Sequence, residues 1–183
     1  LAGTSLEPLL ILPPEPGHAF PPTISSVAVS PGRGRVAVAA SDGKLRILEP
    51  AEEGRAAPHR SFDVSAVQVC RFLDDGRLLL GEMTGELALL DLEEGRELYR
   101  RQLEYDPVYD LAVSPGGDRV AVAFRSSRIQ ILEAESGEMV RALEGHRDSV
   151  YDVAWLGEDA LVSGSKDKRV LFWDLDAVAS TPR

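Results

Sequence analysis

Hydrophobic positions along the chain recur in four copies that share one spacing. Each copy has two or three spaced apolar residues, a turn rich in Gly, Asp or Pro, an apolar run, a second turn and another apolar run. The first apolar anchors are Ile24, Val67, Val108 and Val150, so the copies follow one another after 43, 41 and 42 residues. The start of the second run and an apolar residue of the third are 11 positions apart in every copy, at 36 and 47, 78 and 89, 120 and 131, and 161 and 172. This constant register indicates an internal repeat.

The runs within a copy have the length and the boundaries of β-strands. They are short, rich in Val, Leu and Ile, and bounded by turn sequences such as SDG at 41–43 and SPGGDR at 114–119. Polar Gly segments at 52–55, 93–96 and 135–138 separate the copies, and each precedes one more candidate strand. Four short antiparallel strands per period of about 42 residues are typical of a propeller blade. The pattern therefore predicts an all-β fold of β-propeller blades, four of them in this chain, with almost no helix.

The predicted units follow the repeat, with a short arm before it and a tail after it. The apolar stretch at 9–12 is a candidate closing strand within the arm, because the fourth copy ends without an outer strand of its own. The predicted ranges are an arm at 1–17, blade repeats at 18–60, 61–98, 99–140 and 141–176, and a tail at 177–183.

Four blades span about half of a ring of eight, and an open end would expose apolar faces and unpaired strand edges. Three arrangements stay open: part of a larger ring whose other blades come from the same parent chain, half of a two-chain ring such as an eight-bladed homodimer, or a self-closed disc. The chain begins with Leu rather than Met, which we interpret as a sign that it is a piece of something longer.

The charge of the chain argues against nucleic acid and membrane surfaces as partners. The formal net charge is −10, from 20 basic and 30 acidic residues, and this charge repels phosphate backbones and anionic lipids. Cys70 is the one cysteine, which excludes an internal disulfide and favours a reducing, cytoplasmic location. No apolar run reaches the 18 or more residues of a membrane span.

The fourth copy carries the most specific motif. Gly145 and His146 precede it, Ser163 lies in its second predicted strand, Asp167 lies in the following turn, and Trp173 with Asp174 closes the third strand. This set resembles the WD-repeat β-propeller family, and the likeness covers about residues 18–175. The resemblance implies a hydrogen-bonded tetrad in which Trp173 reaches the Ser163 hydroxyl, Ser163 reaches the His146 ring, and Asp167 holds the other ring nitrogen. A buried indole N–H and a buried imidazole both need such partners.

The first three copies depart from this motif. Leu48, Leu90 and Leu132 replace the Trp, and the turn Asp survives only as Asp42. The His register holds Phe20, Asp63 and Glu104. We expect these blades to be held by apolar packing and ladder hydrogen bonds alone.

Catalytic interpretations of the fourth copy are weaker than the structural one. Ser163 and Lys166 match the S-x-x-K motif of penicillin-recognising enzymes, but that motif needs a helix N-terminus and here a strand follows. Ser163, His146 and Asp167 also have the residue types of a hydrolase triad. A Trp that donates to the Ser would occupy the nucleophile, and no oxyanion loop is visible. We therefore predict no catalytic residue in the chain.

Two acidic turns and one basic turn have the composition of ion sites. The segments 74–76 (DDG) and 116–118 (GGD) lack the D-x-D-x-D-G spacing of a calcium loop, so they are expected to be hairpin turns. The segment 33–35 (RGR) lacks the Gly-Lys-Ser/Thr and the helix of a phosphate-binding loop. Accordingly, the sequence predicts no metal and no cofactor.

The family resemblance places candidate partner-binding residues on the rim, just after the His register and just before the turn Asp. Tyr and Arg are residue types enriched at binding hot spots. The candidates are Arg147, Asp148, Tyr151 and Lys166 in the fourth copy, and Tyr105, Asp106, Tyr109 and Arg125 in the third.

The function that follows from the resemblance is a non-enzymatic scaffold for protein or peptide partners. An alternative is a regulatory sensor segment of a larger signalling NTPase or kinase. A further alternative is a propeller enzyme with a site in the central channel, although His18, His59 and His146 are the only histidines. Fold alone does not separate these functions.

Overall fold

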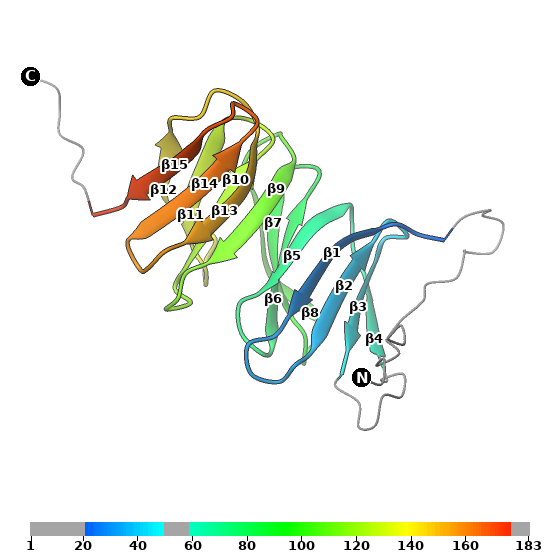
Figure 1. Cartoon of the computed structure of the whole chain (residues 1–183). Coiled ribbons are helices and arrows are strands. Elements are labelled where there is room, and N and C mark those ends of the chain that lie inside the picture. Colours follow the sequence, from blue (N-terminus) through cyan, green and yellow to red (C-terminus); the bar gives the residue numbers. More distant parts are fainter. Residues whose placement is uncertain (1–20, 50–58, 177–183) are drawn as a thin grey trace, which may run out of the picture.

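The computed structural model describes residues 21–49 and 59–176, and this part of the chain is all-β, with no helix (Figure 1). Within each sheet, every strand pairs antiparallel with the next, and there are three sheets of four strands and one sheet of three. The strands are β1 (Ile24–Val29), β2 (Val36–Ala40), β3 (Lys44–Leu48), β4 (His59–Asp63), β5 (Val67–Phe72), β6 (Arg77–Glu82), β7 (Glu86–Asp91), β8 (Arg96–Gln102), β9 (Val108–Val113), β10 (Arg119–Phe124), β11 (Arg128–Glu133), β12 (Met139–Glu144), β13 (Val150–Trp155), β14 (Ala160–Ser165) and β15 (Val170–Asp174).

We number the sheets as blades 1 to 4 in chain order. Blade 1 is β1–β4, blade 2 is β5–β8, blade 3 is β9–β12, and blade 4 is β13–β15. The predicted fold class is confirmed. The sheets end a few residues beyond the predicted repeat boundaries at 60, 98 and 140, because the outer strands β4, β8 and β12 complete the sheet that precedes them. The predicted arm at 1–17 and the tail at 177–183 lie outside the described residues.

The blades stand side by side, with their first strands adjacent along one edge of the array (Figure 1). Apolar side chains fill each of the three seams between neighbouring blades. Leu45 and Ile47 of blade 1 share a cluster with Leu78 and Leu80 of blade 2, and the other two seams repeat this arrangement. Burial of apolar surface at about 25 cal/mol per Å² makes these seams the main stabilising element of the array.

Each first strand contains a register shift at one equivalent place, between Ile24 and Ser26 in β1 and between Val150 and Asp152 in β13. A bulge turns the following side chain out of the regular alternation. Ser26 Oγ accepts a hydrogen bond from the Cys70 N–H of blade 2 at 3.1 Å. Asp110, the equivalent residue of blade 3, accepts one from the Val153 N–H of blade 4, also at 3.1 Å. The residues after the bulges of blades 1 and 3 therefore join each of these blades to the next one near the inner edge.

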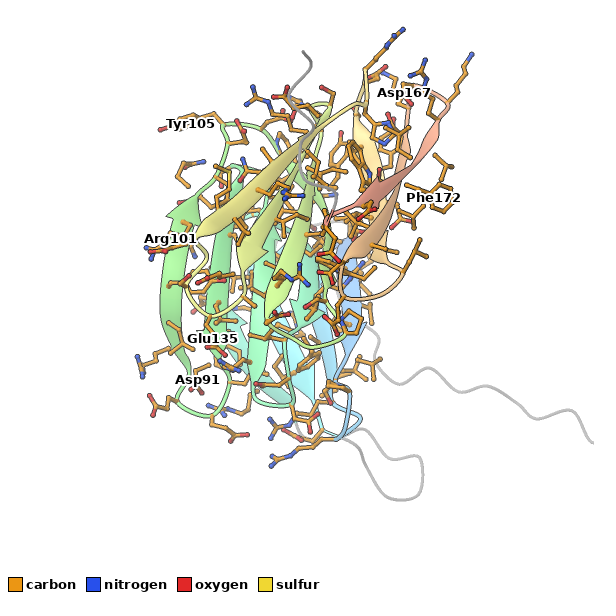
Figure 2. The ribbon with its side chains drawn as sticks, turned by 90° about the vertical axis from the view of Figure 1, so that its left-hand side faces the viewer. Asp91, Arg101, Tyr105, Glu135, Asp167 and Phe172 are labelled. Carbon is orange, nitrogen blue, oxygen red and sulfur yellow. The ribbon has the colours of Figure 1, made fainter. Side chains whose placement is uncertain are left out.

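Arginines at the start of the second strands join the blades at the opposite end from Tyr105 and Asp167, which mark the upper end in Figure 2. Each guanidinium reaches a carboxylate of the next blade. The pairs are Arg35 with Glu93 at 2.8 Å, Arg77 with Glu135 at 2.6 Å and Arg119 with Asp159 at 3.0 Å. Each seam is therefore bridged at this end by one arginine–carboxylate ion pair.

Candidate functional site

Four polar side chains of blade 4 form one hydrogen-bonded chain beneath the upper end of the sheet. The Trp173 indole N–H donates to Ser163 Oγ at 2.8 Å, and Ser163 Oγ lies 2.8 Å from His146 Nε2. His146 Nδ1 lies 3.0 Å from Asp167 Oδ2. His146 and Ser163 are buried, at 6% and 2% exposure. The structure thus brings together the four residues that the family resemblance linked.

The order of these hydrogen bonds defines the tautomer of the neutral His146 ring. A carboxylate accepts hydrogen bonds, so Nδ1 carries the proton and Nε2 accepts from the Ser163 hydroxyl. Burial acts to raise the pKa of Asp167, but hydrogen bonds from the Arg147 N–H, the His146 ring and the Arg169 N–H outweigh it and lower this pKa to about 2. Asp167 is therefore a carboxylate near neutral pH. Its hydrogen bonds with His146 and the Arg147 N–H connect the turn between β14 and β15 to the segment that leads into β13.

This geometry argues against a hydrolase triad at Ser163. Its hydroxyl already accepts the Trp173 N–H, and the 2% exposure of the residue leaves no access for a substrate. Lys166, the lysine of the S-x-x-K match, lies in the turn after β14 rather than on a helix. The tetrad is a structural support of the upper end.

The rim candidates of blade 4 lie around the tetrad. Asp148 is half-buried, and its carboxylate lies 3.7 Å from Lys166 Nζ. The Arg147 backbone N–H donates to Asp167 at 2.9 Å, while the Arg147 side chain is exposed. Tyr151 is 53% exposed at the start of β13. Because the tetrad fixes the backbone at 146–147, the neighbouring rim side chains project from a rigid segment.

The candidates of blade 3 occupy the equivalent positions. Asp106 accepts hydrogen bonds from Arg125 Nε at 2.9 Å and from the Ser126 N–H. Tyr105 is 93% exposed and projects from the upper end of the molecule (Figure 2). The ion pair of Asp106 with Arg125 thus matches the pair of Asp148 with Lys166 one blade further on.

One aromatic pair spans the seam between these blades. The rings of Tyr109 and Tyr151 are stacked, with their centroids 5.7 Å apart and their planes at 25°. Both residues occupy the second position of an inner strand, at the upper end of β9 and β13. The structure therefore combines the rim candidates of the two blades into one surface, which we call the upper rim and define by the eight predicted residues.

A charged cluster on the inner edge was missed by sequence reasoning. Arg71 donates to Asp110 at 2.7 Å, and Asp152 lies beside Asp110 in a groove of about 370 Å³ lined by inner-strand residues. Burial, and then the neighbouring Asp152, raise the pKa of Asp110 to about 6, although Arg71 acts in the opposite direction. An alignment of the repeats could have indicated this cluster, because Asp110 and Asp152 are both the third residue of an inner strand. Within the described ranges, no group of three or more His, Cys, Asp or Glu side chains is arranged to hold a metal ion.

The prediction that blades 1 to 3 rely on apolar packing and ladder bonds alone is wrong. In blade 2, the Glu82 carboxylate is fully buried and accepts hydrogen bonds from Arg100 at 2.6 Å and from Ser65 at 2.8 Å. In blade 3, Glu104, which occupies the His register, accepts from Gln130 at 3.0 Å. Each of these blades replaces the tetrad by a different polar network, because a buried polar group requires a partner.

The candidate ion turns are satisfied by the protein itself. Asp74 Oδ1 accepts from the Gly76 and Arg77 N–H groups, both at 2.8 Å. Asp75 Oδ1 accepts from the N–H groups of Gly32 and Arg33, at 2.8 and 3.0 Å. The backbone at 32–33 therefore binds the Asp75 carboxylate of the next blade. In the third turn, Ser114 Oγ donates to Asp118 at 2.8 Å.

Comparison with known proteins identifies the repeats. The model of the WD domain, G-beta repeat, matches residues 7–48 and 137–174. Protein HIR1 of Mycosarcoma maydis is 31% identical over 163 residues, which are 82% of this chain and 14% of that protein. The THO complex subunit 6 homolog of Rattus norvegicus is 28% identical over 172 residues, 84% of this chain and 50% of that protein. The intraflagellar transport protein 122 homolog of Xenopus tropicalis is 39% identical over 67 residues, 36% of this chain and 6% of that protein. The chain thus spans half or less of the length of these relatives.

Proposed function

The chain belongs to the WD-repeat family, and from this membership we propose that it is a non-enzymatic scaffold whose upper rim, over blades 3 and 4, binds a protein or peptide partner. Proteins with WD repeats generally bind other proteins. One relative is named as a subunit of the THO complex, that is, of a multiprotein assembly.

One observation carries the proposal, namely the stacked pair of Tyr109 and Tyr151 with an ion pair on each blade. Aromatic rings offer a large contact area at a low cost in side-chain entropy, and they are enriched at binding hot spots. Arg125 with Asp106 and Lys166 with Asp148 supply donors and acceptors that are already oriented. A preorganised surface loses less entropy on binding than a flexible one.

The polar chemistry of the upper rim suits a peptide with both an apolar anchor and charged side chains. An anchor would pack on the tyrosine pair, while an acidic or a basic group of the partner would pair with the exposed ends of Arg125 or Asp148. The chain as a whole is acidic, so we do not include nucleic acid or membrane lipid among the partners. In the described residues, no helix is long and apolar enough to cross a bilayer. The buried free thiol of Cys70 supports the proposed cytoplasmic location.

We also propose that the two open ends of the four-blade array are covered by further blades. Unpaired apolar faces and strand edges promote aggregation, so further blades complete the ring, either from the same parent chain or from a second copy.

A quantitative affinity purification tests the binding surface. Wild-type protein is compared with Tyr151→Ala and Arg147→Glu on the upper rim, and with Arg96→Glu as a matched control. Arg96 is exposed and begins β8 next to Asp91, which Figure 2 shows at the lower end of the molecule. We expect the two rim variants to lose a shared set of partners that the control retains. Identical partner sets for all four proteins would count against the upper rim.

A further inference from the structure

Three basic side chains of blade 4 have no hydrogen-bond or ion-pair partner among residues 21–49 and 59–176. They are Arg147, Lys168 and Arg169, and all three are exposed. Every other Lys and Arg in these ranges has a carboxylate or a backbone carbonyl of the chain within reach, as Arg96 has Glu94. The unpaired cations are therefore not scattered over the surface, but gathered on one blade.

The three side chains leave the backbone around one buried carboxylate. Arg147 lies in the segment that leads into β13, and Lys168 and Arg169 lie at the turn between β14 and β15. Asp167 accepts hydrogen bonds from the backbone N–H groups of Arg147 and Arg169, both at 2.9 Å, and so holds the two segments together. Figure 2 shows Asp167 at the upper end of the molecule, with side chains that end in nitrogen extending above it. We call Arg147, Lys168 and Arg169 the basic tip.

The backbone at Lys168 is strained. Its φ is +68°, and it is the one residue other than glycine with a positive φ in the described part of the chain. Its N–H closes the turn at 3.1 Å, as the N–H groups of Gly43 and Gly85 close the equivalent turns of blades 1 and 2. Those two glycines have φ +74° and +82°. A left-handed backbone disfavours a residue with a Cβ, so the turn itself favours glycine, and the lysine side chain points to a role at the surface.

The basic tip is positive on a molecule that is negative as a whole. Asp167 offsets one of the three charges, but its side chain is only 6% exposed and its oxygens already bind His146 and two backbone N–H groups. The chain carries a formal net charge of −10. A local region of the opposite sign favours a partner with complementary charge. The ligand that fits the basic tip is therefore anionic.

A carboxylate-rich protein segment fits this surface better than a nucleic acid. The unpaired positive charge is confined to one end of blade 4, and the neighbouring upper rim carries the carboxylates of Asp106 and Asp148. A nucleic acid has a phosphate at every nucleotide, so the part of it beyond the basic tip would be repelled. A protein segment has carboxylates only where its sequence places them, and it can offer apolar side chains to the rest of the rim.

We propose that the basic tip binds a run of Asp or Glu side chains in the protein partner, beside the apolar anchor that packs on Tyr109 and Tyr151. The inference rests on the proposed function for the place of docking, and it adds the charge of the docked segment. Arg147 belongs both to the basic tip and to the upper rim, so the two contacts lie on one continuous surface. Each guanidinium of the basic tip can hold a carboxylate through two N–H groups, and Lys168 adds a third charge.

Fluorescence anisotropy with labelled peptides tests the inference on the full chain. The probe has one Phe followed by a run of Glu, and in the matched peptide Gln replaces each Glu. We expect the wild type to bind the Glu peptide more tightly, with an affinity that falls as salt is added. Arg169→Glu should weaken this binding by about tenfold or more, because like charges then face each other. Lys168→Gly should weaken it by about threefold, as the loss of one exposed ion pair predicts.

Lys168→Gly contains its own control for folding. Glycine suits the left-handed backbone, so the midpoint of urea unfolding should stay the same or rise while the affinity falls. Arg96→Glu makes the same change of charge as Arg169→Glu, but at the lower end of the molecule. A six-residue strand such as β14 is about 20 Å long, which is about twice the Debye length at physiological salt. Arg96→Glu should therefore leave the affinity unchanged within about twofold.

Equal binding of the Glu and Gln peptides by the wild type overturns the inference, and so does binding that withstands both Arg169→Glu and Lys168→Gly. An oligouridylate of the same charge that binds more tightly than the Glu peptide also overturns it, since the basic tip would then select phosphate. Tyr151→Ala separates the inference from the proposed function. If Tyr151→Ala alone weakens the binding, the upper rim is supported and the acidic segment is overturned. If the two variants of the basic tip alone weaken it, the acidic segment is supported and docking on the tyrosine pair is overturned.

Discussion

At the scale of single residues, the indole of Trp173 shows how one N–H group connects a strand to the surface. It donates to Ser163, whose hydroxyl serves His146, whose other nitrogen is held by Asp167. A neutral hydrogen bond contributes about 0.5 to 1.5 kcal/mol to stability. We therefore predict that Trp173→Phe, which keeps an aromatic ring but removes the N–H, lowers the free energy of unfolding by at least about 1 kcal/mol.

Urea denaturation in a double-mutant cycle with Ser163→Ala separates the hydrogen bond from the change in ring size. The loss caused by Trp173→Phe should be smaller by about 1 kcal/mol in the Ser163→Ala background, because the acceptor has already been removed. Equal losses in both backgrounds would show that the bond does not stabilise the fold.

Asp110 gives the stability of the molecule a dependence on pH. Burial and the adjacent Asp152 raise its pKa from 3.8 to about 6 in the folded protein. Since folding raises this pKa, the contribution of protonated Asp110 is fully present below pH 3.8 and is lost as the pH rises through about 6. Asp110→Asn keeps an acceptor for the Val153 N–H and cannot ionise, so we predict that the wild type loses stability relative to this variant over that range.

Chemical denaturation at several pH values measures the difference between the two proteins, in which the other titrating groups cancel. The difference in the free energy of unfolding should change by on the order of 1 to 2 kcal/mol between low and high pH. This is less than the full pKa shift would give, because the cluster is partly open to solvent at Arg71 and the solvent screens it. A difference that is constant with pH would contradict the raised pKa.

At the scale of strands and turns, the sequence predicts more of the fold than of the contacts within it. The constant interval of 11 residues between the second and third apolar runs predicted the pairing of β2 with β3 and of its equivalents, because turn chemistry and alternation are local properties. The network of Glu82 with Arg100 was not predicted, since its partners lie on β6 and β8 and meet only after the sheet has formed. A charged residue in a buried register was its one visible sign. The rim residues came from family resemblance, but the stacking of Tyr109 on Tyr151 depends on the distance between two blades, which no local pattern contains.

The turn between β6 and β7 offers a direct test of a seam. Gly85 has φ +82°, and a Cβ there would lie 2.1 Å from the carbonyl oxygen of Glu104 in the segment that leads to blade 3. Gly117 has a similar φ of +78° but open space around it. Gly117→Ala should therefore cost only the left-handed strain of about 1 kcal/mol, whereas Gly85→Ala should cost at least about 2 kcal/mol more because backbone must move.

Thermal or urea unfolding of Gly85→Ala and Gly117→Ala, measured side by side, gives the difference in their stability losses. The backbone strain is common to both variants and cancels in this difference. Similar losses for the two variants would mean that the turn of blade 2 does not closely approach blade 3 in solution.

At the scale of the whole molecule, the apolar seams among residues 21–49 and 59–176 join each blade to its sequence neighbours, so stability is expected to be the sum of the blades and of the seams between them. Blades 2 and 3 have a seam on both sides, whereas blades 1 and 4 each have one seam within the chain. Two features recur in every seam, namely an apolar pair from the third strand and an arginine at the lower end. A polar link after the bulge joins blades 1 and 2 and blades 3 and 4. Val170 and Phe172 of blade 4 are 63% and 75% exposed, so this blade buries less apolar surface than the central ones and is expected to open more easily.

Amide hydrogen exchange measures this gradient strand by strand. We predict the slowest exchange in β6, β7 and β10, because these strands lie between two seams, and faster exchange in β14, which has one seam within the chain. If β14 exchanged as slowly as β10, the stability of the array would not be a sum over neighbouring blades.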